Sequence, residues 1–198
     1  MNRLVRTGLL ASLAAALPTL AFAHTGHGAD GFAHGVLHPL TGLDHLLAMV
    51  AVGIFAGQLG GRALWAVPAT FLALMAAGGM LGVAGIDVPW VEIGIAGSVI
   101  ALGGAIALGL RAPLAVAMAV TGLFAIFHGH AHGTEIPEAA SGAAYGLGFL
   151  LATAALHLAG IGLGTAIGRT GSERGAVLVQ GTGAAIAVAG IAILAGIA

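Results

Sequence analysis

Apolar residues run along nearly the whole chain in long stretches that short polar segments interrupt. Most stretches hold about 20 residues, enough for a helix to cross a hydrocarbon core of about 30 Å. They lack the period-two alternation of a membrane β-strand. The pattern therefore predicts an all-α membrane protein with a six-helix transmembrane domain at residues 37–198. The expected spans lie near 37–59, 63–84, 91–110, 113–129, 139–168 and 175–197.

The first 23 residues have the organisation of a secretory signal peptide. Two arginines precede a short apolar run, Pro18 ends this run, and Ala21-Phe22-Ala23 matches the A-x-A cleavage pattern. We expect residues 1–23 to be removed, and an uncleaved first transmembrane helix is the alternative. Cleavage would leave residues 24–36 as a His- and Gly-rich periplasmic N-terminal segment.

Composition narrows the class of protein further. Hydrophobic residues make up 59% of the 198 residues and charged residues only 7%, with a net charge of -1. So few charges exclude a soluble enzyme, a disordered chain and a nucleic-acid-binding protein. The 35 glycines indicate close helix–helix packing in lipid, because small residues let backbones approach. Cysteine is absent, which excludes disulfides and thiolate metal sites.

The arginines between the spans all lie on one side. One set of loops holds Arg62, Arg111, Arg169 and Arg174, whereas the other side holds Asp30, Asp87, Glu92, Glu135 and Glu138. Because arginine and lysine stay on the cytoplasmic side, the acidic side should face outward. A cleaved signal peptide independently places the mature N-terminus outside. Both arguments predict a multi-pass protein of the bacterial inner membrane with a periplasmic N-terminus.

Histidine supplies most of the remaining chemistry. All nine histidines but His157 are expected at the outward end, together with a carboxylate inside the first span. Imidazole and carboxylate without thiol suit Ni²⁺, Co²⁺, Cu²⁺ or Zn²⁺ rather than Mg²⁺ or Ca²⁺. The candidate metal ligands are His24, His27, His34, His38, Asp44, His45, His128, His130, His132, Glu135 and His157.

Spacing predicts how these side chains converge. Pro39 suits the first helical position, which puts His38 near the N-cap and His45 about two turns into the span. The two rings would then lie about 20° apart around one helix and about 10 Å apart along it. His128 and His132 share a face if their helix persists that far. Asp44 is expected to be functional, as a ligand or by orienting an imidazole, because an intramembrane carboxylate is costly.

Several candidates have simpler interpretations. His24 and His27 could be solvated loop residues, and His38 could serve only as a helix cap. His157 lies deep in the fifth predicted span, where it is either a residue of the ion path or a neutral core histidine bonded to a backbone carbonyl.

Two segments resemble the HupE/UreJ family, bacterial membrane proteins associated with nickel hydrogenases and ureases. The first is HPLTGLDHLLAMVAVG, at 38–53, and the second is FHGHAHGTEIPEAASGAAYGLGFLLATAALHLAGIGLG, at 127–164. The resemblance extends over essentially the whole mature chain. It implies a nickel or cobalt permease.

We therefore predict a permease or facilitator for Ni²⁺ or Co²⁺, not an enzyme and without a prosthetic group, with Zn²⁺ or Cu²⁺ as alternative ions. The expected partners are the divalent ion and the lipid bilayer, with a homo-oligomer left open. No phosphate-binding motif for an ATPase is present in the sequence. Two alternatives are a metal-binding sensor or accessory subunit that does not transport, and an intramembrane zinc hydrolase with an acidic base.

Overall fold

The structure is a computed structural model that describes residues 29–136, 141–168 and 173–196. Every regular element within these residues is an α-helix, which confirms the all-α prediction. The helices are α2 (Ala29–Thr41), α3 (Leu43–Leu59), α4 (Ala63–Val83), α5 (Val91–Ala107), α6 (Leu114–Thr134), α7 (Gly142–Gly168) and α8 (Glu173–Leu194). The predicted signal peptide, His24 and His27 lie outside the described residues.

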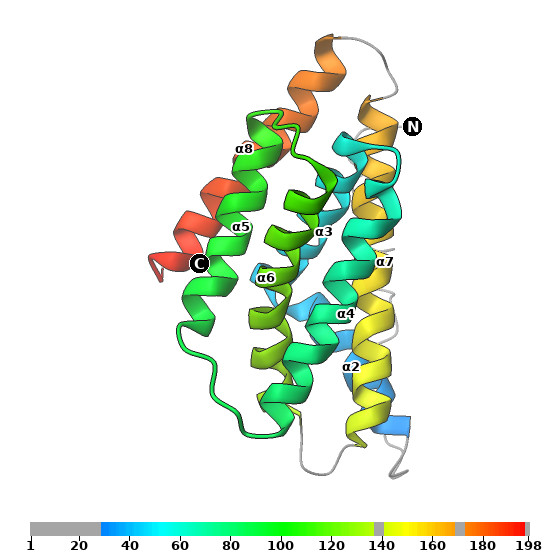
Figure 1. Ribbon diagram of the computed structural model, residues 1–198, viewed down its shortest axis with the longest axis vertical. Helices are drawn as coiled ribbons and strands as arrows, with labels where there is room; N and C mark the ends of the chain where they lie inside the picture. The colour runs from blue at the N-terminus through cyan, green and yellow to red at the C-terminus, as the bar shows by residue number, and fades with distance from the viewer. Residues whose placement is uncertain (1–28, 137–140, 169–172, 197–198) are drawn as a thin grey trace, which may run out of the picture.

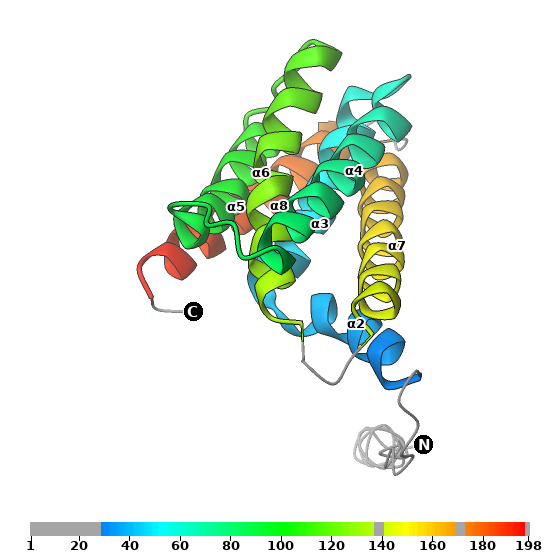
Figure 2. The same ribbon diagram turned by 60° about the horizontal axis from the view of Figure 1, so that its bottom comes forward.

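The helices form a bundle around α3 (Figures 1 and 2). The most extensive pairs are α4 with α6, α5 with α8, and α3 with α7, while α2 packs along α7. Helix α3 also contacts α4, α5 and α8, so residues such as Ala48, Val52 and Ala56 are fully buried. The core of the molecule therefore surrounds α3, the helix that carries His45.

Glycine sets the closest approaches between helices, as the composition predicted. At the crossing of α3 and α7, a Cβ added to Gly160 would lie 2.9 Å from the Gly53 Cα and would overlap the Val50 carbonyl. At the crossing of α4 and α6, a Cβ on Gly133 would lie 2.9 Å from the Gly79 Cα. Backbones this close leave no room for a side chain, which explains the small residues at both crossings.

The helices match the six predicted spans only in part. Among the described residues, α4, α6, α7 and α8 are long and apolar enough to cross a membrane, and a bent pair formed by α2 and α3 makes a fifth candidate. The helix in the third predicted span, α5, has only 17 residues, about 25 Å at 1.5 Å per residue. The described structure thus gives four or five candidate spans.

The first predicted span is not one continuous helix, which corrects the geometry expected for His38 and His45. Helix α2 ends at Thr41, Gly42 is extended, and α3 begins after a bend of 81°. Pro39 lies inside α2 rather than at a first helical position, so His38 occupies a last turn and not an N-cap. His45 lies in the first turn of α3, and the prediction that it lies two turns into the span is wrong.

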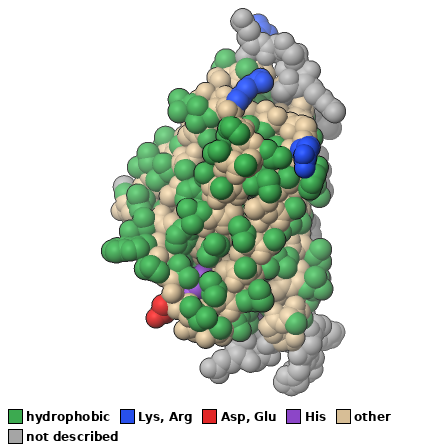
Figure 3. All heavy atoms as spheres, viewed as in Figure 1, with side chains coloured by type: hydrophobic (Ala, Val, Ile, Leu, Met, Phe, Trp, Pro, Cys, Tyr) green, Lys and Arg blue, Asp and Glu red, His purple; other side chains and the backbone are tan. Residues whose placement is uncertain are grey.

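The surface is apolar around the middle and charged at its ends. In the face drawn in Figure 3, hydrophobic side chains cover the centre, arginine atoms lie near the top, and acidic atoms lie near the bottom. Arg62 and Arg111 precede α4 and α6 at one end, here called the arginine end; Asp87 and Glu135 lie in loops at the other, the acidic end. Such an exterior suits a lipid bilayer.

Candidate metal centre

The HGHAHG segment places two histidines inside the bundle because its glycines pack against α4. A Cβ on Gly129 would lie 2.8 Å from the Gly79 backbone nitrogen and would overlap the Met75 carbonyl. Helix α6 continues to Thr134, which confirms that His128 and His132 share a helical face. Because the glycine face of α6 packs against α4, the face that carries His128 and His132 is directed toward α3 and α7.

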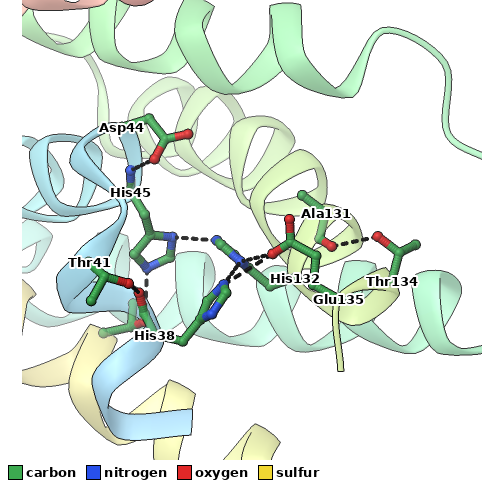
Figure 4. Close-up of polar contacts among 9 residues, drawn as sticks. His38, Thr41, Asp44, His45, Ala131, His132, Thr134 and Glu135 are labelled. Carbon is green, nitrogen blue, oxygen red and sulfur yellow. Dashed lines mark hydrogen bonds and ion pairs between the residues drawn. The ribbon is translucent and has the colours of Figure 1, made fainter. Parts of the chain in front are cut away.

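Two groups of three ligand side chains meet at the acidic end, and Figure 4 labels all of their members except His128. The inner group consists of His45, His128 and His132, and the outer group of His38, His132 and Glu135. Each side chain offers one ligand atom, and within a group these atoms lie within 4.8 Å of one another. Helices α2, α3 and α6 all contribute, so the cluster exists only in the folded protein.

The outer group is compact. His38 Nε2 lies 3.0 Å from His132 Nδ1 and 3.0 Å from Glu135 Oε2, and the latter two atoms are 3.1 Å apart. Two ligands at right angles on one ion, with bonds of about 2.1 Å, are separated by about 3.0 Å. The three distances in the outer group are hydrogen-bond distances, and they also bring the three atoms close enough to converge on one metal ion.

In the inner group, a hydrogen bond orients His128. The Ser98 hydroxyl donates to the Ile95 carbonyl at 2.6 Å, which uses its only proton. Ser98 Oγ must therefore accept the hydrogen from His128 Nε2, 2.8 Å away. A neutral ring protonated on Nε2 carries its lone pair on Nδ1, which is buried without a partner among the described residues. His128 is thus held in the tautomer whose Nδ1 lone pair is available to a cation.

His45 completes the inner group at the start of α3. Its Nδ1 lies 3.2 Å from His132 Nε2, and its Nε2 lies 3.3 Å from the Thr153 hydroxyl on α7. Both His45 and His128 are fully buried. Burying a neutral polar group is costly unless it has a partner, and the partners here are the Thr153 and Ser98 hydroxyls and the His132 ring.

Exposure rises from the inner group to the outer one. The side chain of His132 is 15% exposed, that of His38 34% and that of Glu135 53%, against none for His45. An ion arriving from the acidic end would consequently meet Glu135 and His38 first and the buried imidazoles last.

Asp44 makes no hydrogen bond to an imidazole among the described residues. Its Oδ1 accepts a hydrogen bond from the His45 backbone N–H at 2.7 Å, and the carboxylate lies in the first turn of α3 (Figure 4). A negative charge there stabilises the helix N-terminus through the helix dipole. Asp44 is therefore placed to position His45 through the backbone, one of the two roles that the sequence analysis left open.

The remaining candidates lie apart from the two groups. His34 is exposed on α2, and His130 points to the Ile86 carbonyl, 2.9 Å from its Nε2. His157 lies one turn beyond Thr153 on α7, packs on Phe71 with ring centroids 5.2 Å apart, and is 1% exposed. Both of its ring nitrogens lack a partner among the described residues, so the backbone-carbonyl bond considered for it is not formed there.

Sequence reasoning missed three residues beside the groups. Ser98 was overlooked because one serine in an apolar helix is typical of packing. Tyr145 and Phe149 of α7 are the aromatic residues that flank His38, and the Tyr145 hydroxyl is buried without a partner among the described residues. The i, i+4 spacing of Tyr145 and Phe149 could have indicated an aromatic face beside the site, although such a pair usually belongs to a hydrophobic core.

Fold and site together define a helical membrane protein with imidazole and carboxylate groups gathered at one end of its bundle. A family model described as HupE / UreJ protein matches residues 11–193. The chain is also 49% identical over 190 residues to "Protein HupE" of Rhizobium leguminosarum bv. viciae, covering 96% of this chain and 97% of that protein. The chain belongs to the HupE/UreJ family, a hydrogenase and urease accessory family linked to nickel and cobalt transport. No solved structure matches it.

Proposed function

We propose that the chain is a permease or facilitator that moves Ni²⁺ or Co²⁺ across the inner membrane, from the acidic end to the arginine end. The observation that carries this proposal is the pair of ligand groups, which leads from partly exposed side chains to fully buried ones. Family membership supports the class of ion. We also propose that His38, His45, His128, His132 and Glu135 bind the ion, with Asp44 positioning His45.

The charge distribution supports the direction. With the acidic end in the periplasm, the arginines lie in the cytoplasm and the outer group faces the external ion. An inside-negative membrane potential then favours entry of a divalent cation by roughly 4.6 kcal/mol per 100 mV, twice the value for a single charge. Neutral imidazoles hold the ion in exchangeable form, which conduction requires.

His157 supplies the next polar position along this route. It follows Thr153 by one helical turn, so the two side chains share a face of α7. Two turns further on, Gly164 lies on nearly the same face and borders a cavity of about 490 Å³ at the arginine end, which Gln58 and Thr165 also line. The buried, unpartnered nitrogens of His157 therefore lie between the ligand groups and this inner cavity.

Replacing His157 with alanine tests this part of the route. We expect Ni²⁺ uptake per molecule to fall by about tenfold or more, an added barrier of about 1.4 kcal/mol, while binding at the outer group is unchanged. The measurement is uptake of radioactive Ni²⁺ by cells producing each variant, divided by the amount of protein in the membrane. Reduced protein with normal uptake per molecule would instead assign His157 to packing.

The same assay tests the function as a whole. Cells producing the unmodified chain should take up Ni²⁺ or Co²⁺ faster than cells without it, with Mg²⁺ uptake unaffected because imidazole ligands select against that ion. Equal Ni²⁺ and Co²⁺ uptake with and without the chain would contradict the proposal.

A further inference from the structure

His132 belongs to both ligand groups, and it faces them with different nitrogens. Its Nδ1 lies 3.0 Å from His38 Nε2 and 3.1 Å from Glu135 Oε2 in the outer group. Its Nε2 lies 3.2 Å from His45 Nδ1 in the inner group. The His132 ring thus lies between the two groups and presents one nitrogen to each of them (Figure 4).

A neutral imidazole has one lone pair, on whichever nitrogen lacks the hydrogen. His132 can accordingly complete the outer group through Nδ1 or the inner group through Nε2, but not both at once. When Nε2 binds an ion, the Nδ1–H has an acceptor in Glu135; when Nδ1 binds, the Nε2–H has an acceptor in His45 Nδ1. Each state of the ring therefore has a hydrogen-bond partner already in place.

Electrostatic repulsion between bound ions also favours one ion over two. Two divalent cations on opposite sides of one ring would repel each other strongly, and the inner group, as described, contains no carboxylate among its ligands. In contrast, a single ion on either side keeps two ligands of its own, His38 and Glu135 outside or His45 and His128 inside.

From this geometry we infer that the two groups are alternative positions for one ion, which passes from the outer to the inner position by exchanging Nδ1 for Nε2 of His132. In this exchange Nε2 releases its hydrogen as the ion binds there and Nδ1, which the ion leaves, takes one up, so the ring stays neutral and no net proton is gained or lost. The inference rests on the proposed function, and it adds that the chain holds one ion across the two groups at a time. His132 is then the shared ligand, whereas His38 and His128 each belong to one position only.

The test is Co²⁺ binding to the full-length chain purified in detergent, with stoichiometry from equilibrium dialysis and ligand type from the visible absorption of the bound ion. We expect one Co²⁺ per chain. His128→Ala and His38→Ala should each retain one Co²⁺ with different spectra, because the ion stays in the outer or the inner position respectively. His132→Ala should lower affinity by about a hundredfold or more.

Thr41→Ala is the matched control for His38→Ala, because Thr41 is exposed in the same turn and its hydroxyl bonds only the His38 backbone carbonyl at 2.8 Å. It should bind one Co²⁺ with the unmodified spectrum. Two Co²⁺ per unmodified chain, with one lost in each of His38→Ala and His128→Ala, would overturn the inference and leave the proposed transport intact. Loss of all binding in both variants would indicate one undivided site and also overturn it. Failure of the unmodified chain to bind either Co²⁺ or Ni²⁺ would overturn the proposed function as well.

Discussion

Replacing His132 with alanine should reduce Ni²⁺ and Co²⁺ uptake to the level of membranes that lack the protein. No other residue of the described chain belongs to both ligand groups, so its loss leaves each group with two ligands. Removing a group that merely orients a metal ligand costs about 10- to 100-fold in affinity, and removal of a direct ligand should cost at least that. Uptake against ion concentration, with the amount of membrane protein measured in parallel, gives the result.

The protein should still fold and reach the membrane. Alanine is the best helix former, and His132 is partly exposed rather than at the centre of the core. Thr134→Ala is the control, because Thr134 is exposed in the same turn and its hydroxyl bonds only the Ala131 carbonyl at 2.6 Å. Uptake by His132→Ala equal to that by Thr134→Ala would refute the assigned role of His132.

A methyl group at Gly160 should produce the second large effect, this time on stability. A Cβ there would overlap the Val50 carbonyl and approach the Ile54 nitrogen to 3.1 Å, and both obstacles are backbone atoms that cannot rotate away. We expect Gly160→Ala to destabilise the protein by about 2 kcal/mol or more, within the range for overpacked cores. Thermal loss of helical circular dichroism in detergent measures the change.

Gly162 provides the comparison within the same helix. A Cβ at this position would meet nothing within 4 Å. Because alanine favours a helix over glycine by about 1 kcal/mol, Gly162→Ala should unfold at the same or a higher temperature than the unmodified chain. Equal melting temperatures for Gly160→Ala and Gly162→Ala would show that the α3–α7 crossing is not held as tightly as described.

The sequence was a good guide to features that depend on local composition. Long apolar runs predicted helices at most of the places where they occur, and abundant glycine predicted close crossings such as that of Gly53 with Gly160. The i, i+4 spacing of His128 and His132 predicted their shared face, because that relation depends only on a helix that continues to Thr134. The HupE/UreJ resemblance was confirmed over nearly the full chain.

Features that depend on how helices meet could not be predicted in this way. Pro39 was interpreted as the start of a span, whereas the helix ends at Thr41 and a new one starts beyond Gly42. Glycine is typical of a helix end and aspartate of the first turn of the next helix, so Gly42 and Asp44 together indicated a helix boundary in the sequence. That His132 contacts both His38 and His45 depends on the bend and on the packing of α6, which no periodicity within one segment contains.

Transport by this chain alone is the central claim, and reconstitution measures it most directly. The purified chain would be placed in liposomes that contain a metal-sensitive fluorescent indicator and carry an inside-negative potential, and Ni²⁺ or Co²⁺ would be added outside. The account predicts a fluorescence change that saturates with ion concentration, requires the chain and is abolished in His132→Ala. A fluorescence trace identical to that of liposomes without protein, from a chain that still binds Co²⁺, would contradict it.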